Sequence, residues 1–74
     1  MKTYNGWRNF ETWKINLEFG LNDGGFKGYS EDMLKEYVES YIDENCNDEI
    51  LKGMLFDFTS EVDWEEIAKH IEED

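Results

Sequence analysis

The clearest structural signal in this chain is the stretch SEDMLKEYVESYIDENC, which occupies residues 30–46. Ser30 is a good N-cap, and the two acids after it fall in the first turn, where the helix dipole favours negative charge. The apolar side chains recur at the three- and four-residue spacing of an amphipathic helix, and they are Met33, Leu34, Tyr37, Val38, Tyr41 and Ile42. Residues 30–46 are therefore predicted to form a helix with one apolar face.

The opposite face of this helix is acidic. Asp32, Glu36, Glu39 and Asp43 follow one another at i, i+4, i+7 and i+11, which places them in a single stripe. Four carboxylates along ~16 Å of helix give roughly one charge per ~4 Å, close to the ~3.4 Å between phosphates of one DNA strand. Neighbouring carboxylates in the stripe destabilise the helix by ~0.2 to 0.5 kcal/mol per pair, so we expect a function that compensates for this cost.

A second helix is predicted from Asn47 or Asp48 to about Phe58. Gly53 in its interior costs ~1 kcal/mol of helix stability relative to alanine. Phe56 is predicted to point away from the apolar face, which consists of Ile50, Leu51, Met54 and Phe58.

The last helix is predicted to follow Asp63, which forms an acidic version of the capping box with Glu66. Its apolar residues share one face at i, i+3, i+4 and i+7, and they are Trp64, Ile67, Ala68 and Ile71. Its outer face is acidic again, through Glu65, Glu66, Glu72 and Glu73.

Residues 13–19 fit two patterns. Their apolar and polar side chains alternate strictly, as in a strand, but a helical stripe behind a possible N-cap at Asn9 also passes through them. A strand would have to pair with residues 2–4 or 55–58, and neither is a convincing partner, so we favour a helix. The run NDGG at residues 22–25 ends either element. The helical stripe that passes through residues 13–19 consists of the apolar side chains Phe10, Trp13, Leu17 and Leu21.

The predicted fold is an all-α, small single-domain bundle of about four short helices that covers residues 1–74. The alternative is an α+β fold with a short strand at residues 13–19. Aromatic residues make up 16% of the chain, which indicates a folded domain rather than a disordered acidic tail. A single Cys46, the lack of a run of ~20 apolar residues and the lack of a secretion leader predict a protein of the reducing cytoplasm.

The negative charge is confined to one part of the chain. Residues 30–74 contain 16 Asp and Glu against three lysines, a net charge of −13, whereas residues 1–29 carry a net charge of +1. Over a Debye length of ~8 Å at physiological salt, such a surface attracts basic proteins and repels nucleic acid and anionic membranes. The expected partner is therefore a basic protein, bound by a monomer or a homodimer without direct contact to nucleic acid or membrane.

Patterns for catalysis or metal binding are weak. Residues 43–54 begin like an EF-hand calcium loop, but Asp48 and Met54 stand where the loop needs a glycine and a bidentate glutamate. His70 is the only histidine and has no nucleophile at a motif spacing, while Cys46 lies among acids that disfavour its thiolate. We therefore expect no enzyme activity, no metal and no cofactor.

Two segments, YNGWRNFETW at residues 4–13 and SEVDWEEIA at residues 60–68, resemble the two ends of a family of short phage and plasmid proteins. The resemblance implies an origin in a mobile element and supplies no catalytic residue. Because small acidic phage proteins often inhibit host defence, it also implies an anti-CRISPR or antirestriction protein whose partner is a CRISPR effector subunit or a restriction enzyme. The most specific matches are Asn5, Gly6, Trp7, Asn9, Glu11, Thr12, Trp13, Val62 and Trp64.

Charge and resemblance together favour an inhibitor that presents the acidic stripe to the basic nucleic-acid-binding surface of a defence protein, helped by the acids of the last helix. The alternative is a non-enzymatic interaction or regulatory protein that binds a partner or a second copy through an aromatic patch around Trp7, Phe26, Tyr29 or Phe56.

The family-like motif itself is interpreted as a folding device. Asn5 and Gly6 suit a tight turn, Asn9 can cap a helix, and the large tryptophans can fill a core that short helices leave open. The alternative interpretation is that Trp7 or Arg8 is a recognition anchor, since Trp and Arg dominate binding hot spots.

Overall fold

The computed structural model describes residues 4–73, without the side chain of Glu73, and contains four helices. They are α1 (Phe10–Phe19), α2 (Glu31–Asn45), α3 (Glu49–Thr59) and α4 (Trp64–Glu73). Within residues 4–73, the only strand-like pairing is an isolated bridge between Tyr4 and Trp7. The all-α prediction is confirmed, and the alternative with a strand at residues 13–19 is wrong because this segment lies in α1.

Capping side chains set where the helices begin. The N-caps of α1 and α2 are Asn9 and Ser30, as predicted, and the N-cap of α3 is Asp48, one of the two residues at which that helix was expected to begin. Each of the three side chains accepts a backbone N–H of the first turn. α1 ends earlier than predicted, because Gly20 adopts the left-handed region at φ 60 and forms the C-cap. Leu21, which was assigned to the helical stripe, therefore lies beyond α1, where it is fully buried.

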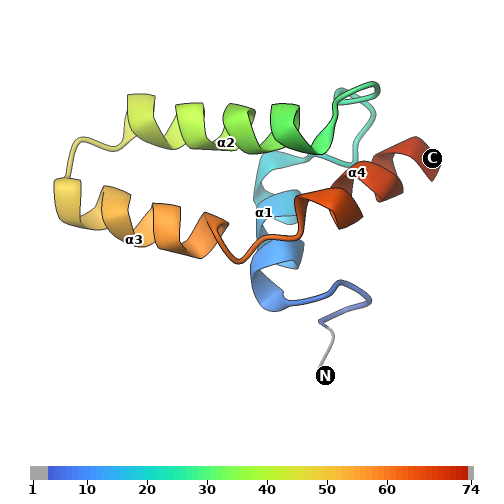
Figure 1. Ribbon diagram of the computed structural model, residues 1–74, viewed down its shortest axis with the longest axis horizontal. Helices are drawn as coiled ribbons and strands as arrows, with labels where there is room; N and C mark the ends of the chain where they lie inside the picture. The colour runs from blue at the N-terminus through green and yellow to red at the C-terminus, as the bar shows by residue number, and fades with distance from the viewer. Residues whose placement is uncertain (1–3, 74) are drawn as a thin grey trace.

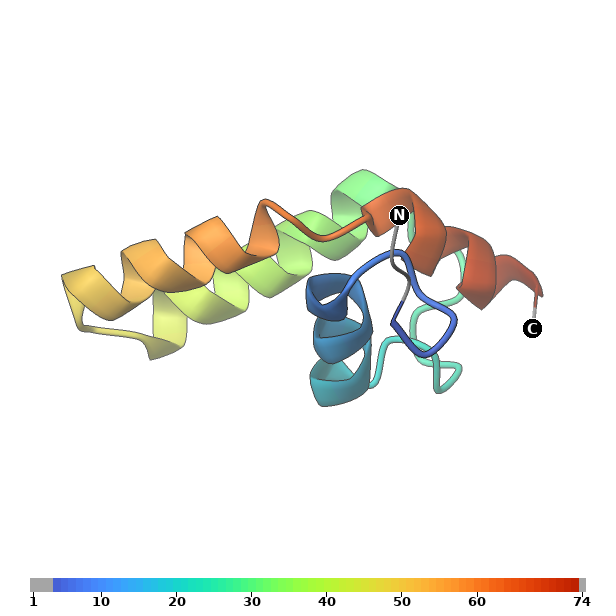
Figure 2. The same ribbon diagram turned by 90° about the horizontal axis from the view of Figure 1, so that it is seen from below.

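α2 and α3 lie side by side and antiparallel, as a hairpin (Figure 1). After a short turn, α4 continues from the end of α3 and packs near the start of α2. α1 forms a second layer against one face of these helices, and the outer half of the hairpin extends past it (Figure 2). None of the helices within residues 4–73 has the length and apolar character needed to cross a membrane.

The core lies where α1, α2 and α4 meet. Leu34 and Val38 from α2 and Ile67 from α4 are fully buried, and Ile15 of α1 packs against them. Each of these helices therefore buries a stripe of its own side chains. α3 differs, because Thr59 is its one buried residue.

The predicted apolar face of α3 is wrong. Ile50, Leu51 and Met54 are exposed to 77%, 52% and 62%, and of the predicted face only Phe58 packs against the core. Phe56, predicted to point away, is half-buried against the core instead. The cause is tertiary, because α3 contacts α2 along one side and α1 only near its C-terminal end, so that neighbouring helices leave its outer half uncovered.

Candidate functional site

The acidic stripe predicted on α2 is present as a row of side chains on the outside of that helix. Asp32, Glu36 and Asp43 are exposed, and Glu39 is half-buried. Glu36, Glu39 and Asp43 line one shallow depression, which Phe56 of α3 closes on the other side. The helical spacing thus brings the carboxylates together as expected, and it places them beside the groove between α2 and α3.

One member of the stripe is neutralised within the chain. The Nζ atom of Lys52 on α3 lies 3.2 Å from Oδ1 of Asp43, and the Lys52 side chain is only 19% exposed. The hydrogen bond to Asp43 raises the pKa of Lys52 above its ordinary value of 10.5, so the ammonium is held in its charged form. Asp43 therefore forms an ion pair that links α2 to α3. The other three acids of the stripe, Asp32, Glu36 and Glu39, have no ion pair within residues 4–73.

Two of the predicted acids of α4, Glu65 and Glu72, line one depression beside the segment that precedes α2. Glu66 accepts the backbone N–H of Arg8 at 2.9 Å, and Glu72 accepts the backbone N–H of Gly28 at 3.4 Å. These two carboxylates therefore hold the N-terminal segment and the loop before α2. Glu65 is exposed, and the side chain of Glu73 lies outside the described part of the chain.

A second acidic depression, which the sequence did not indicate, lies between the start of α2 and the start of α4. Glu31, Glu61, Asp63 and Glu65 line it, together with Arg8. These acids come from three different segments of the chain, so no residue spacing in the sequence predicts that they lie close together. Within residues 4–73, no group of three or more His, Cys, Asp or Glu side chains is arranged to hold a metal ion. The acids can therefore attract cationic groups by charge, and they form no coordination site.

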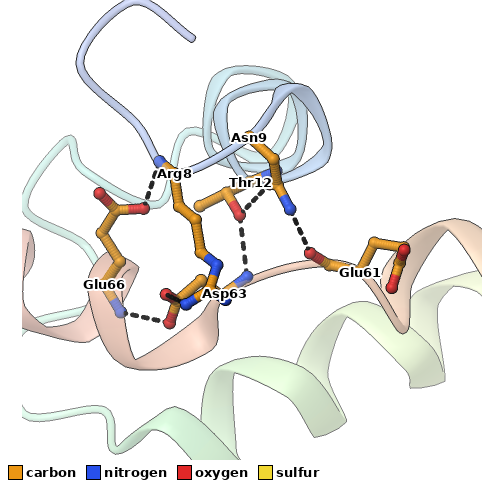
Figure 3. Close-up of polar contacts among 6 residues, drawn as sticks. All are labelled: Arg8, Asn9, Thr12, Glu61, Asp63 and Glu66. Carbon is orange, nitrogen blue, oxygen red and sulfur yellow. Dashed lines mark hydrogen bonds and ion pairs between the residues drawn. The ribbon is translucent and has the colours of Figure 1, made fainter. Parts of the chain in front are cut away.

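The two family-like segments meet at a network of hydrogen bonds (Figure 3). Thr12 of α1 is fully buried, and its Oγ1 accepts the backbone N–H of Asp63 at 2.8 Å and donates to Oδ1 of Asn9 at 2.6 Å. The side-chain amide of Asn9 also donates to the carbonyl oxygen of Glu61 at 2.7 Å. One cap residue thus starts α1 and fixes the turn between α3 and α4.

Charged side chains extend this network on its outer side. Nη1 of Arg8 lies 3.4 Å from Oδ2 of Asp63, whose other oxygen caps α4 by accepting the N–H of Glu66 at 3.1 Å. Glu66 in turn accepts the N–H of Arg8, so the three residues close a ring of contacts across the two segments (Figure 3). Of the motif residues, Asn9 and Thr12 hold the two segments together, which agrees with the interpretation of the motif as a folding device.

The aromatic residues proposed as recognition anchors are mostly engaged in the interior. Trp7 is buried and packs against the ring of His70, with 4.2 Å between ring centroids, so it cannot act as an exposed anchor. Phe26, Tyr29 and Phe56 are half-buried and pack against the core. Of the four positions around which an aromatic patch was expected, Trp7 is excluded by its burial, whereas Tyr29 lines a surface depression together with the exposed Tyr37 and Tyr41.

Comparison with known proteins places the chain in a family. It belongs to the family described as "Family of unknown function (DUF7249)", which matches residues 1–74. No curated protein and no solved structure matches the chain. The predicted kinship with an uncharacterised family is thus confirmed, whereas the mobile-element origin and the anti-defence role belong to the proposal below.

Proposed function

We propose that this protein is a non-enzymatic anti-defence inhibitor, of the anti-CRISPR or antirestriction type, encoded by a phage or another mobile element. It acts in the cytoplasm of the host cell and binds the basic nucleic-acid-binding surface of a CRISPR effector subunit or a restriction enzyme. The origin is supported by the resemblance of residues 4–13 and 60–68 to phage and plasmid proteins. The proposed binding to a basic surface is supported by the negative charge of the chain.

The observation that carries this proposal is the net charge of −13 over residues 30–74. On α2, Asp32, Glu36 and Glu39 carry charge without an ion pair within the described residues; Asp32 and Glu36 are exposed, and Glu39 is half-buried. Helical spacing separates them by about 4.5 to 6 Å along the axis, which is wider than the ~3.4 Å per phosphate of a single strand but of the same order. A groove lined with Lys and Arg would meet a similar series of negative charges.

Charge reversal on α2 tests the proposal. The double variant E36K/E39K should lose inhibition, because it replaces two of the three unpaired carboxylates by ammonium groups that a basic groove repels. A matched control is E44K/D57K, which changes the net charge equally at exposed positions outside the stripe. The circular dichroism spectrum of both variants should match that of the wild type.

The readout is the plating efficiency of a sensitive phage on hosts that carry defined CRISPR or restriction systems and express the protein. Wild type and E44K/D57K should restore plating on at least one host, and E36K/E39K should not. In vitro, the affinity for the defence protein captured from that host should fall steeply as NaCl is raised. Full inhibition by E36K/E39K, or no rescue in any host, would contradict the proposal.

A further inference from the structure

An apolar cleft lies where α1 meets the projecting half of the α2–α3 hairpin. Its cavity volume is about 270 Å³. All three helices contribute to its walls, which are almost entirely apolar and include Ile15 and Phe19 of α1, Tyr41 of α2, Cys46 after it, and Leu55 and Phe58 of α3. The arrangement of the helices explains the cleft, because α1 stands against the hairpin and leaves its outer half uncovered (Figure 2).

The cleft is large enough for one large side chain. An apolar cavity of roughly 150 Å³ accommodates a benzene molecule, so the volume here suits an aromatic ring or a branched aliphatic group. Leu51 precedes Leu55 by one helical turn and is 52% exposed, and it extends the apolar row of α3 from the cleft toward the end of the hairpin. A partner helix that fills the cleft would find further apolar contact along this row.

The charges on the same elements are mainly negative. Glu44, Asp48 and Glu49 are exposed, lie within three residues of the lining residue Cys46 in the sequence, and have no ion pair within residues 4–73. Glu18 and Asp43 are already paired with Lys14 and Lys52. A second copy of this chain would bring the same acids against each other, which is unfavourable. A cationic partner would neutralise them instead.

We infer that this cleft binds a cationic amphipathic segment of a partner protein, which inserts one large apolar side chain between α1 and the hairpin. The Lys and Arg residues of that segment lie against the unpaired acids close to Cys46 in the chain, and the apolar anchor supplies the specificity that charge alone lacks. The cleft shares no lining residue with the depression beside the α2 stripe. The inference therefore extends beyond the proposed function and does not require the partner to be a defence protein.

Two synthetic peptides of equal charge test the inference. The probe is a lysine-rich amphipathic helix, about three turns long, with one Trp flanked by Leu. Its control has the same length and lysine count, with Gln in place of Trp and Leu. Fluorescence anisotropy of the labelled peptides should show the probe binding at least about tenfold more tightly than the control. Equal affinities would overturn the inference, because charge would then explain all binding.

Cys46 reports whether the probe occupies the cleft, since this residue lines the cavity and its thiol forms no disulfide. The probe should slow the reaction of Cys46 with an uncharged disulfide reagent, and the Gln control peptide should not. Tight binding that leaves the reaction rate unchanged would place the probe elsewhere and overturn the inference. If the free protein instead protects Cys46 by forming a dimer, a molar mass that rises with protein concentration would reveal it. That result would show a second copy in the cleft and would also overturn the inference.

A matched pair of variants isolates the apolar contact. L55E places a carboxylate in the cleft wall, whereas M54E places one at the neighbouring exposed position outside it. Both substitutions add the same attraction for a cationic peptide, so only a lost apolar contact makes L55E the weaker binder. L55E should bind the probe at least about tenfold less tightly than M54E. Equal binding by the two variants would overturn the inference.

A second measurement covers the case in which L55E does not fold. Wild-type protein alkylated at Cys46 with N-phenylmaleimide carries a ring in the cleft, and it should lose probe binding by at least about tenfold. Unchanged affinity after alkylation would overturn the inference. The E36K/E39K variant separates this inference from the proposed function, because it should lose anti-defence activity and still bind the probe more tightly than the control peptide.

Discussion

A single hydroxyl group joins the two segments that characterise this chain. Thr12 lies in α1, 51 residues before Asp63, and its Oγ1 is the acceptor for the backbone N–H that precedes α4. The same oxygen donates to Asn9, which caps α1 and holds the carbonyl group of Glu61. Because Thr12 is fully buried, water cannot replace these bonds, so the side chain positions α4 relative to α1.

Replacing this hydroxyl by a methyl group should destabilise the fold. T12V keeps the shape of the side chain but leaves the N–H of Asp63 without an acceptor, at a cost of about 1 to 3 kcal/mol. The matched control is T59V, which changes the other buried threonine. Thr59 donates only to the carbonyl oxygen of Phe56 in its own helix, and that oxygen also accepts the N–H of Ser60, so T59V should cost less. Urea unfolding followed by circular dichroism measures both, and equal losses would contradict the role assigned to Thr12.

At the scale of the helices, α3 is the element with the fewest buried residues within residues 4–73. Its buried surface is limited to the residues that face α2 and the end of α1, and Ile50 and Met54 point outward. Gly53 lies in its interior at an exposed position, and a Cβ atom there would meet no heavy atom within 4 Å. The stability of α3 should therefore depend more on helix propensity than that of α2 does.

A pair of glycine substitutions should act in opposite directions. G53A should stabilise the protein by about 1 kcal/mol, because alanine restricts the unfolded chain and favours the helix without a clash. G20A should destabilise it by about 1 kcal/mol, because Gly20 has φ +60 and its added Cβ would lie 3.0 Å from a carboxylate oxygen of Asp23. Thermal unfolding measures both changes, and a loss of stability in G53A would show that α3 needs flexibility at this position.

The same helices show what the sequence could and could not predict. α2 was predicted with its N-cap because one apolar stripe, one cap and one acidic first turn all agree within the segment. The face of α3 was predicted wrongly because periodicity shows which side chains share a face and does not show whether another helix covers that face. The alignment of the acidic stripe followed from helix geometry. The pairing of Asp43 with Lys52 and of Glu66 with Arg8 depends on tertiary contacts, which no local pattern contains.

For the whole molecule, the balance of charge is unfavourable to folding. The chain has 19 acids against seven Lys and Arg residues, and three ion pairs are formed within residues 4–73. Two of these pairs tie different parts of the chain together, while Lys14 and Glu18 lie on one helix. Most carboxylates therefore repel one another in the folded state. This self-repulsion is the cost that a binding function would explain, because a cationic partner removes it.

That cost can be measured by neutralising the stripe without a partner. E36Q/E39Q removes three like-charge neighbours on α2 and one favourable pair with Lys35, so it should raise the free energy of unfolding by about 0.5 to 1 kcal/mol at low salt. In ~1 M NaCl, where the Debye length is ~3 Å, the gain should largely disappear. The control E44Q/D57N removes the same charge at positions that have no acid three or four residues away within their own helix, so its gain should be smaller. An equal or larger gain in the control would mean that neighbouring carboxylates in the stripe do not repel one another more than other acids of the protein do. The acids of the stripe would then contribute only to the general negative charge.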